Sequence, residues 1–381
     1  MPGWEIIGPE ERKNLNKIFT KSKGIMFAHG FENIRNNNFF VREFEKKIKK
    51  KLKVKYCLAT TSGTMAQYIA MKALGIKQGD EVITQAFTFV ATVEAIIALG
   101  AKPVIINIDE SYGICLSELK KSITKKTKLI IPVPMLGNQT KIKEINSIAK
   151  KNNILVLEDA CEALGAKING KYVGTNSDIG VYSLDFAKTI TTGEGGLIVT
   201  NKKKYFDFCK EFHDHGHKGS NKIGRADEKA RIPGLNLRMT ELQAAVGIAQ
   251  IKKLDFIVKK NQINKKFLKS KINSKIINFR KIISPKDELA DTLIFNFETK
   301  QKAKKFYSIF SKKYPVKILP NALYWHFAYF WKHMLLKKQR IKLLKSKNLL
   351  ERSIALPISV KEKKIVLQKK VIFINNLLQK I

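Results

Sequence analysis

Three groups of residues in the first half of the chain have the types and spacing for chemistry on a bound ligand. Ser62-Gly63-Thr64 stands between an apolar run and a helical pattern, where free backbone N–H groups and hydroxyls form a site for an anion such as a phosphate. Glu158-Asp159-Ala160-Cys161-Glu162 places carboxylates directly after another apolar run. Lys188 follows Asp159 by 29 residues, in a short loop between two apparent strands. A desolvated lysine near a fixed cation can act as an amine nucleophile toward a carbonyl.

Each feature has a simpler explanation when it is considered alone. The Ser-Gly-Thr turn could only cap a helix, a carboxylate at a strand end could cap a helix or bind a metal, and any of the 63 lysines could be a surface residue. The three together are what pyridoxal phosphate requires: an anion cradle, a carboxylate that keeps the pyridine nitrogen protonated, and a lysine for the Schiff base. The combination therefore indicates pyridoxal 5'-phosphate as the cofactor.

The elements that must position these residues alternate along the chain from about residue 54. The pattern predicts strands at 54–59, 81–84, 103–108, 128–133, 154–157, 180–183 and 196–200. It predicts helices at 65–74, 88–99, 116–122 and 141–151. Such alternation is typical of an α/β fold with a mostly parallel sheet that helices cover on both faces. Because ligands bind at the carboxyl ends of the strands in such sheets, the three groups should meet there.

The basic residues are distributed unevenly over the 381-residue chain, whose formal charge is +40. From residue 251 onward there are 33 basic and 7 acidic residues. This change of composition predicts a large domain at 1–250, with 1–50 partly at the substrate entrance, and a small C-terminal α/β domain at 251–381. A long helix from Glu241 toward Lys260 would join them.

A charge of +40 is compatible with nucleic acid, a membrane surface or an anionic substrate as partner. Only nine of the basic residues are Arg, the side chain that mainly makes bidentate contacts with bases and phosphates. We therefore interpret the lysine excess as background composition and expect no nucleic-acid partner.

The remaining composition points to a cytoplasmic protein without membrane insertion. The first residues lack the pattern of a signal peptide, and no apolar run approaches 18 residues. The four cysteines are widely spaced without a C-x-x-C pair, so neither a disulfide framework nor a metal site is indicated.

Several motifs between residues 60 and 241 occur in the order typical of one family. They are Ser62-Gly63-Thr64, Phe87-Thr88-Phe89-Val90-Ala91-Thr92, Glu158-Asp159-Ala160-Cys161, Ser183, Lys188, Gly193-Glu194-Gly195-Gly196 and Gly234-Leu235-Asn236-Leu237-Arg238-Met239-Thr240-Glu241. The sequence thereby resembles the sugar aminotransferases of the DegT/DnrJ/EryC1/StrS family, which use pyridoxal phosphate. The resemblance implies the type I, aspartate aminotransferase-like fold of these enzymes.

The resemblance also implies a role for each matching residue. Ser62, Gly63, Thr64 and Ser183 would bind the phosphate, Phe89 would stack on the cofactor ring, Asp159 would hold the pyridine nitrogen, Lys188 would form the Schiff base, and Asn236 would reach the phosphate of the neighbouring subunit. The active unit would then be a homodimer with composite active sites. Some family members carry His in place of the lysine and dehydrate sugars, so Lys188 favours transamination with Lys188 as the general acid and base.

The sugar substrate is less well defined by the sequence. Segments 1–11, 214–217, 324–325 and 331–333 are similar to the family member that aminates position 8 of 3-deoxy-octulosonate in lipopolysaccharide biosynthesis. An 8-oxo sugar acid needs a cation for its carboxylate, and Arg35, Arg42 or His217 could supply it, or these side chains could only order loops. Two residues depart from the family pattern: Glu162 lies near the expected cofactor phenolate, and Pro134 replaces a usual His.

The leading hypothesis is thus a sugar aminotransferase with L-glutamate as amino donor, acting on the 8-oxo sugar acid. An alternative within the same reaction is a nucleotide-linked 4-keto or 3-keto hexose, whose diphosphate would also favour positive charge. From a different class comes a basic nucleic-acid or membrane-surface binding protein that retains the fold, which only the charge of +40 suggests.

Overall fold

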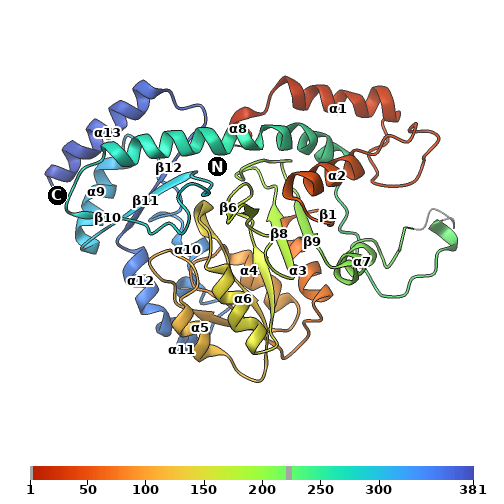
Figure 1. Ribbon diagram of the computed structural model, residues 1–381, viewed down its shortest axis with the longest axis horizontal. Helices are drawn as coiled ribbons and strands as arrows, with labels where there is room; N and C mark the ends of the chain where they lie inside the picture. Colours follow the sequence, from red (N-terminus) through yellow and green to blue (C-terminus); the bar gives the residue numbers. More distant parts are fainter. Residues whose placement is uncertain (1–2, 220–224) are drawn as a thin grey trace.

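A seven-stranded sheet forms the centre of the larger lobe of the protein (Figure 1). The computed structural model describes residues 3–219 and 225–381. In chain order the strands of this sheet are β1 (Tyr56–Thr60), β2 (Glu81–Gln85), β3 (Lys102–Ile106), β4 (Thr127–Ile131), β5 (Leu155–Asp159), β8 (Ile179–Ser183) and β9 (Gly196–Thr200). Their spatial order is β1-β9-β8-β5-β4-β2-β3. Strand β9 runs antiparallel to β1 and β8, and the other neighbours are parallel, so the predicted mostly parallel sheet is confirmed.

Helices cover both faces of this sheet, as the alternation of patterns predicts. One face packs against α3 (Gly63–Ala73), α4 (Val90–Ala98) and α7 (Lys203–Phe212). The other packs against α2 (Phe40–Leu52), α5 (Leu116–Ser122), α6 (Ile142–Lys151) and α8 (Glu241–Lys271). Successive residues point to opposite faces, since Val82 belongs to the first core and Ile83 to the second. Burial on both sides explains why apolar residues of these strands occur on both faces.

The smaller lobe has an antiparallel sheet of three strands, β10 (Ile277–Phe279), β11 (Thr292–Phe297) and β12 (Ser353–Pro357). Helices α9 (Lys300–Phe310) and α13 (Lys364–Gln379) pack on it around a cluster of phenylalanines. The segment between α9 and β12 instead returns to the larger lobe, where Phe327 and Trp331 are fully buried in the core beside α3 and α4. It contains α10 (Leu323–His326), α11 (Lys337–Arg340) and α12 (Leu344–Leu350).

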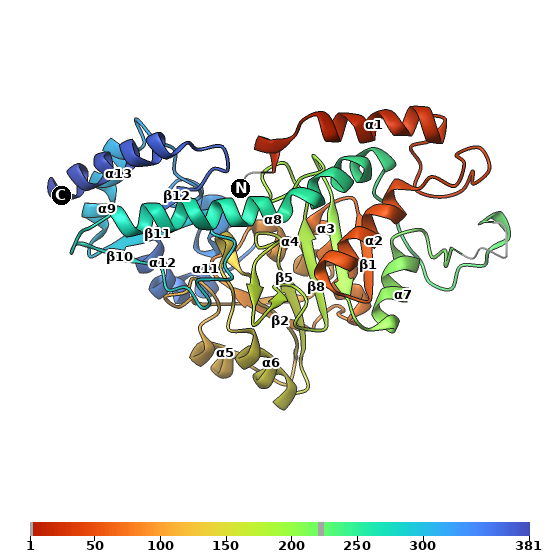
Figure 2. The same ribbon diagram turned by 45° about the horizontal axis from the view of Figure 1, so that its top comes forward.

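Helix α8 joins the two lobes without interruption (Figure 2). Thr240 and Gln243 form a capping box at its start, which satisfies the first backbone N–H groups. The sequence predicts this helix toward residue 260, and the structure extends it to Lys271. Buried Leu254, Ile257 and Leu268 continue its inner face into the smaller lobe, which explains the extra length.

Helix α1 (Pro9–Ser22) lies along the part of α8 that belongs to the larger lobe. The short pair β6 (Lys167–Ile168) and β7 (Lys171–Tyr172) completes the regular structure. Within the described residues, no helix combines the length and the hydropathy needed to cross a bilayer.

Candidate active site

A cavity of about 470 Å³ lies at the carboxyl ends of β1, β5 and β8. Its volume is in the range of small-molecule sites in proteins. Eight of the nine residues predicted to bind the cofactor line it: Ser62, Gly63, Thr64, Phe89, Asp159, Glu162, Ser183 and Lys188. The sequence argument that strand ends bring these residues together therefore agrees with their placement.

The amino end of α3 forms one side of the cavity. Ser62 is the N-cap, and its Oγ accepts a hydrogen bond of 3.1 Å from the Met65 N–H, so the simpler reading of this turn as a helix cap is also correct. The N–H groups of Gly63 and Thr64 stand at the first helical positions, where no intrahelical acceptor exists. A Cβ on Gly63 would lie 2.8 Å from the Ser183 Cβ, which explains why glycine is required between these hydroxyls. The arrangement suits a phosphate.

A buried amide also faces this end of the cavity. Gln67 follows Gly63 by one turn of α3 and is almost completely buried. Its Oε1 has no hydrogen-bond partner among the described residues. Because a buried polar atom is rarely left unpaired, this atom indicates that a polar ligand or water belongs here.

Asp159 ends β5 and points into the cavity as a buried carboxylate. It accepts hydrogen bonds from the Thr92 hydroxyl at 2.7 Å and from the Cys161 N–H at 3.3 Å. Burial raises its pKa above the usual range, against the opposing effect of these donors. Both donors are neutral, and no basic side chain within the described part of the chain forms an ion pair with it. A ligand with a cationic N–H would supply the missing charge, which is what a protonated pyridine offers.

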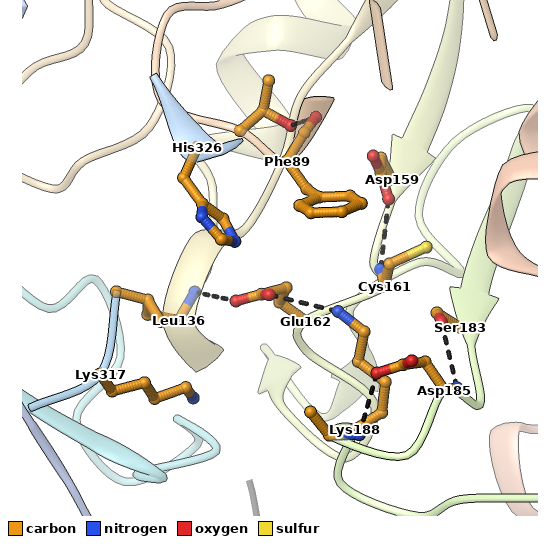
Figure 3. A network of polar contacts seen from close by, with 12 residues as sticks. Phe89, Leu136, Asp159, Cys161, Glu162, Ser183, Asp185, Lys188, Lys317 and His326 are labelled. Carbon is orange, nitrogen blue, oxygen red and sulfur yellow. Dashed lines mark hydrogen bonds and ion pairs between the residues drawn. The ribbon is translucent and has the colours of Figure 1, made fainter. Parts of the chain in front are cut away.

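Lys188 is a buried lysine paired with Glu162 (Figure 3). The Lys188 Nζ lies 3.2 Å from the Glu162 Oε1, and the lysine side chain is 14% exposed. Burial opposes the charge of Lys188, but Glu162 more than compensates and raises the lysine pKa. Burial likewise opposes ionisation of Glu162, yet Lys188, Lys317 and His326 lower its pKa to about 2. The departure of Glu162 from the family pattern therefore provides a counter-ion for the lysine.

The ion pair predicts how stability depends on pH. Because the folded pKa of Glu162 is about 2, below the usual glutamate value of 4.5, its contribution to stability is present above pH 4.5 and is lost as the pH falls toward 2. The contribution is on the order of 3 kcal/mol. Denaturant unfolding measured from pH 5 to pH 2.5 should show a smaller loss of stability for Glu162→Gln than for the wild type. Glu43→Gln, on the exposed side of α2, is the control, and an equal loss in both variants would contradict the assignment.

Phe89 forms the aromatic wall of the cavity at the N-cap of α4. Its ring is 40% exposed, although large apolar side chains in this lobe are mostly buried. It lies 5.2 Å from the His326 ring and is stacked at 6.5 Å on Trp325. An exposed ring held between two others offers a flat surface for a planar ligand.

Two polar side chains from the C-terminal part of the chain, beside Ile318, complete the cavity, and sequence reasoning did not identify either as a site residue. His326 ends α10, and Lys317 precedes it in the segment that returns to the larger lobe. The signal that could have indicated them is the apolar stretch at 322–331, because its burial against α3 and α4 requires the chain to pass this cavity.

The turn that carries Pro134 contacts Glu162 directly. The Leu136 N–H donates to the Glu162 Oε2 at 3.2 Å, and Leu136 has a left-handed φ of 53°. Buried Arg280, after β10, donates to the carbonyls of Met135 and Leu136 at 2.9 and 2.8 Å. Pro134, the second departure from the family pattern, therefore begins a turn that contacts Glu162. Arg280 of the smaller lobe holds this turn in place.

The three residues predicted to bind substrate do not line this cavity. Arg35 is fully buried, forms an ion pair with Glu241 at 3.0 Å and donates to the Phe27 and Asn38 carbonyls, so its guanidinium contacts a loop of its own chain. Arg42 lies over the Phe39 ring at 3.7 Å on the surface. The contacts of Arg35 favour the loop-ordering alternative stated from the sequence, and its role toward a substrate stays a prediction.

His217 and Asn236, the ninth predicted cofactor residue, are not among the residues that line the cavity of their own chain. A bridge between Asp214 and Asn236 joins their two segments. The His217 Nδ1 lies 3.5 Å from the Glu228 Oε2, and Asn236 is exposed. The role of His217 toward the substrate and that of Asn236 across a subunit boundary stay predictions.

The family follows from comparison with known sequences. Residues 32–369 match the DegT/DnrJ/EryC1/StrS aminotransferase family, so the chain belongs to this family. GDP-perosamine synthase of Escherichia coli O157:H7 is 39% identical over 232 residues, which are 60% of this chain and 62% of that protein. The GDP-perosamine synthase of Vibrio cholerae is 37% identical over 58% of this chain and 59% of its own. The chain thus matches less than two thirds of the length of these curated relatives.

Solved structures share the fold over nearly the whole chain. The aminotransferase from Psychrobacter cryohalolentis has a TM-score of 0.86 at 23% identity and covers 99% of this chain and 98% of its own. Helicobacter pylori PseC, an aminotransferase involved in the biosynthesis of pseudoaminic acid, has a TM-score of 0.84 at 21% identity, with 98% of both chains covered. The predicted fold class is confirmed.

Proposed function

We propose that the protein is a pyridoxal-phosphate-dependent aminotransferase that converts a keto sugar to an amino sugar with L-glutamate as donor. The observation that carries the proposal is that one cavity contains the N–H groups at the start of α3, the buried carboxylate of Asp159 and the largely buried amine of Lys188. These are the three groups that the cofactor requires. Family membership supports the same reaction.

The side chains would divide the work as follows. Bound pyridoxal phosphate supplies an aldehyde that links to amines and a ring that withdraws electrons from the donor carbon. Ser62, Gly63 and Thr64 bind the phosphate, and Asp159 keeps the proton on the ring nitrogen. Lys188 would hold the cofactor through its Nζ, and the free Nζ would carry a proton to and from the donor carbon as general base and acid. Glu162 would balance the positive charge of the free lysine as its counter-ion.

The sugar is best supported as a nucleotide-linked keto hexose. Two relatives with 39% and 37% identity are named GDP-perosamine synthase. GDP-perosamine is a nucleotide-linked amino sugar. A third, lipopolysaccharide biosynthesis protein RfbH of Salmonella typhimurium, is 34% identical over 61% of this chain and supports a role in cell-surface polysaccharide biosynthesis. These names favour the hexose over the 8-oxo sugar acid that segment similarity suggests.

The 8-oxo form of 3-deoxy-octulosonate is the second candidate substrate because of the position of one tryptophan. Trp325, in one of the segments on which that similarity depends, stacks on Phe89 at the cavity. We also propose that two chains form a homodimer in which Asn236 of one reaches the site of the other. Asn236 is exposed and does not line the cavity of its own chain, which supports this arrangement.

Spectroscopy and product analysis test the proposal together. Purified protein mixed with pyridoxal phosphate should develop a visible absorbance band that changes when glutamate is added. The glutamate-treated protein is then given a GDP-linked 4-keto hexose or the 8-oxo sugar acid, and the amino sugar is detected by mass spectrometry. Amination of the first supports the proposed substrate, amination of the second alone supports the sugar acid, and a protein without the band would overturn the reaction.

A further inference from the structure

Lys317 reaches the active-site cavity from the smaller lobe as a second buried lysine (Figure 3). Its side chain is only 11% exposed. The Nζ donates to the Asp291 Oδ2 at 2.6 Å and to the Thr292 Oγ1 at 3.0 Å, and the Thr292 hydroxyl donates to the other Asp291 oxygen at 3.1 Å. An ammonium group has three donors, and these contacts use two of them.

Backbone strain accompanies this lysine and its partner. Ile318, which follows Lys317, has φ +63°, and Ala290, which precedes Asp291, has φ +60°. Positive φ is an outlier for a β-branched residue such as isoleucine, because its Cβ substituents collide with the backbone. Strained residues persist where the surrounding structure requires them, and they cluster at ligand sites. Two such residues beside one ion pair indicate that its position is functional.

Lys317 differs from the other charged residues of the cavity because it is a cation that does not hold the cofactor. The acidic side chains that line it are Asp159, Glu162, Asp185 and Glu194, and the lysines among the described lining residues are Lys188 and Lys317. Lys188 is occupied when it holds the cofactor covalently. Burial lowers the pKa of His326, so this ring carries less positive charge than an ordinary histidine would. An anionic substrate group that enters the loaded site therefore finds Lys317 as its basic side chain within the described chain.

We propose that Lys317 is a specificity-determining residue that binds a carboxylate of the substrate through its remaining donor. The carboxylate belongs either to the amino donor or to a sugar acid, and a charge-assisted bond to it would be strong in this enclosed site. Asp291 and Thr292 hold the amine in place, and Asp291 offsets the cost of burying its charge. This inference rests on the proposed function for the identity of the substrates.

Calorimetry with simple carboxylates tests the inference independently of turnover. The probes are glutarate, which carries the carboxylates of the donor without its amine, and 3-deoxy-octulosonate, which carries that of the sugar acid. Lys317→Met alone would leave Asp291 buried without its partner, so the main variant is the double replacement Lys317→Met with Asp291→Asn. It should bind one or both probes about 10- to 100-fold more weakly than the wild type.

Matched variants separate ligand binding from a structural role. Asp291→Asn alone keeps the cation and removes its competitor, so it should bind the same probe as tightly as the wild type or more tightly. Lys317→Arg should keep most of the wild-type affinity for the probe. Lys312→Met, at an exposed lysine five residues earlier, should leave that affinity unchanged. Weaker binding of glutarate assigns the donor, and weaker binding of the octulosonate assigns the sugar acid. Unchanged affinity for both in the folded double variant would overturn the inference.

The test also distinguishes its own failure from that of the proposed function. A wild-type protein that forms no visible band with pyridoxal phosphate refutes the aminotransferase, whatever Lys317 does. A wild-type protein that aminates sugars but whose double variant keeps its KM for glutamate and for the sugar refutes the role of Lys317 alone.

Discussion

Replacing Lys188 with alanine is expected to lower the transamination rate by about 10⁴-fold, which is the largest effect that any single change in this chain should produce. The replacement removes both the amine that holds the cofactor and the group that moves the proton. It also leaves Glu162 buried without the cation that lies 3.2 Å away in the wild type. The pH profile of the remaining activity should therefore no longer show a change caused by titration of the Lys188–Glu162 pair.

Single-turnover kinetics with glutamate measures this effect without interference from product release. Lys150→Ala, at an exposed position of α6, serves as the control for loss of a lysine and should keep full activity. The double variant Lys188→Ala with Glu162→Gln removes the unpaired charge and should regain stability but not activity. Wild-type rates in Lys188→Ala would place the chemistry elsewhere.

Asp159→Asn should have opposite effects on stability and on activity. Burial raises the pKa of Asp159, so ionisation of this carboxyl costs stability in the cofactor-free protein, and that cost grows as the pH rises through its folded pKa. A neutral amide of the same shape relieves it. The same change removes the acceptor that would keep a proton on the cofactor ring, and the rate should fall by about 10²- to 10³-fold.

Two measurements on one preparation test whether Asp159→Asn has these opposite effects on stability and activity. Denaturant unfolding without cofactor should give a free energy of unfolding at pH 8 at least equal to that of the wild type, and the steady-state rate with cofactor should fall. Thr92→Val, which removes a neighbouring hydroxyl that donates to Asp159 at 2.7 Å, should reduce stability and rate together. A stable and fully active Asp159→Asn would refute the role of this carboxylate.

The sequence predicted the parts of the site that depend on strand ends. Asp159 and Ser183 are the last residues of β5 and β8, so knowing that these strands are parallel neighbours is enough to bring them together. Lys188 follows from the same argument, because only a short loop separates it from β8. Strand β9 was expected in place, and it runs antiparallel to β8 because the connection at 184–195 contains no crossover helix.

Residues whose positions depend on distant packing could not be predicted in this way. Lys317 and His326 reach the cavity because the apolar stretch containing Phe327 and Trp331 packs against the larger lobe, which no local pattern records. Arg35 was a reasonable substrate candidate as a lone arginine, but its partner Glu241 lies more than 200 residues later in the chain. Pairing over such distances becomes visible only in the fold.

The uninterrupted helix α8 has a consequence for how the protein folds. The basic composition changes near residue 250, but this position lies inside a helix of 31 residues that is buried against both lobes. Lys265, on its second half, forms a buried ion pair with Glu288, whereas Gln250, nearer its start, donates to Glu11 at 2.8 Å. Neither lobe can complete its core without this helix, so the two should melt in a single cooperative transition. A chain cut at residue 250 would yield two fragments that fold poorly alone.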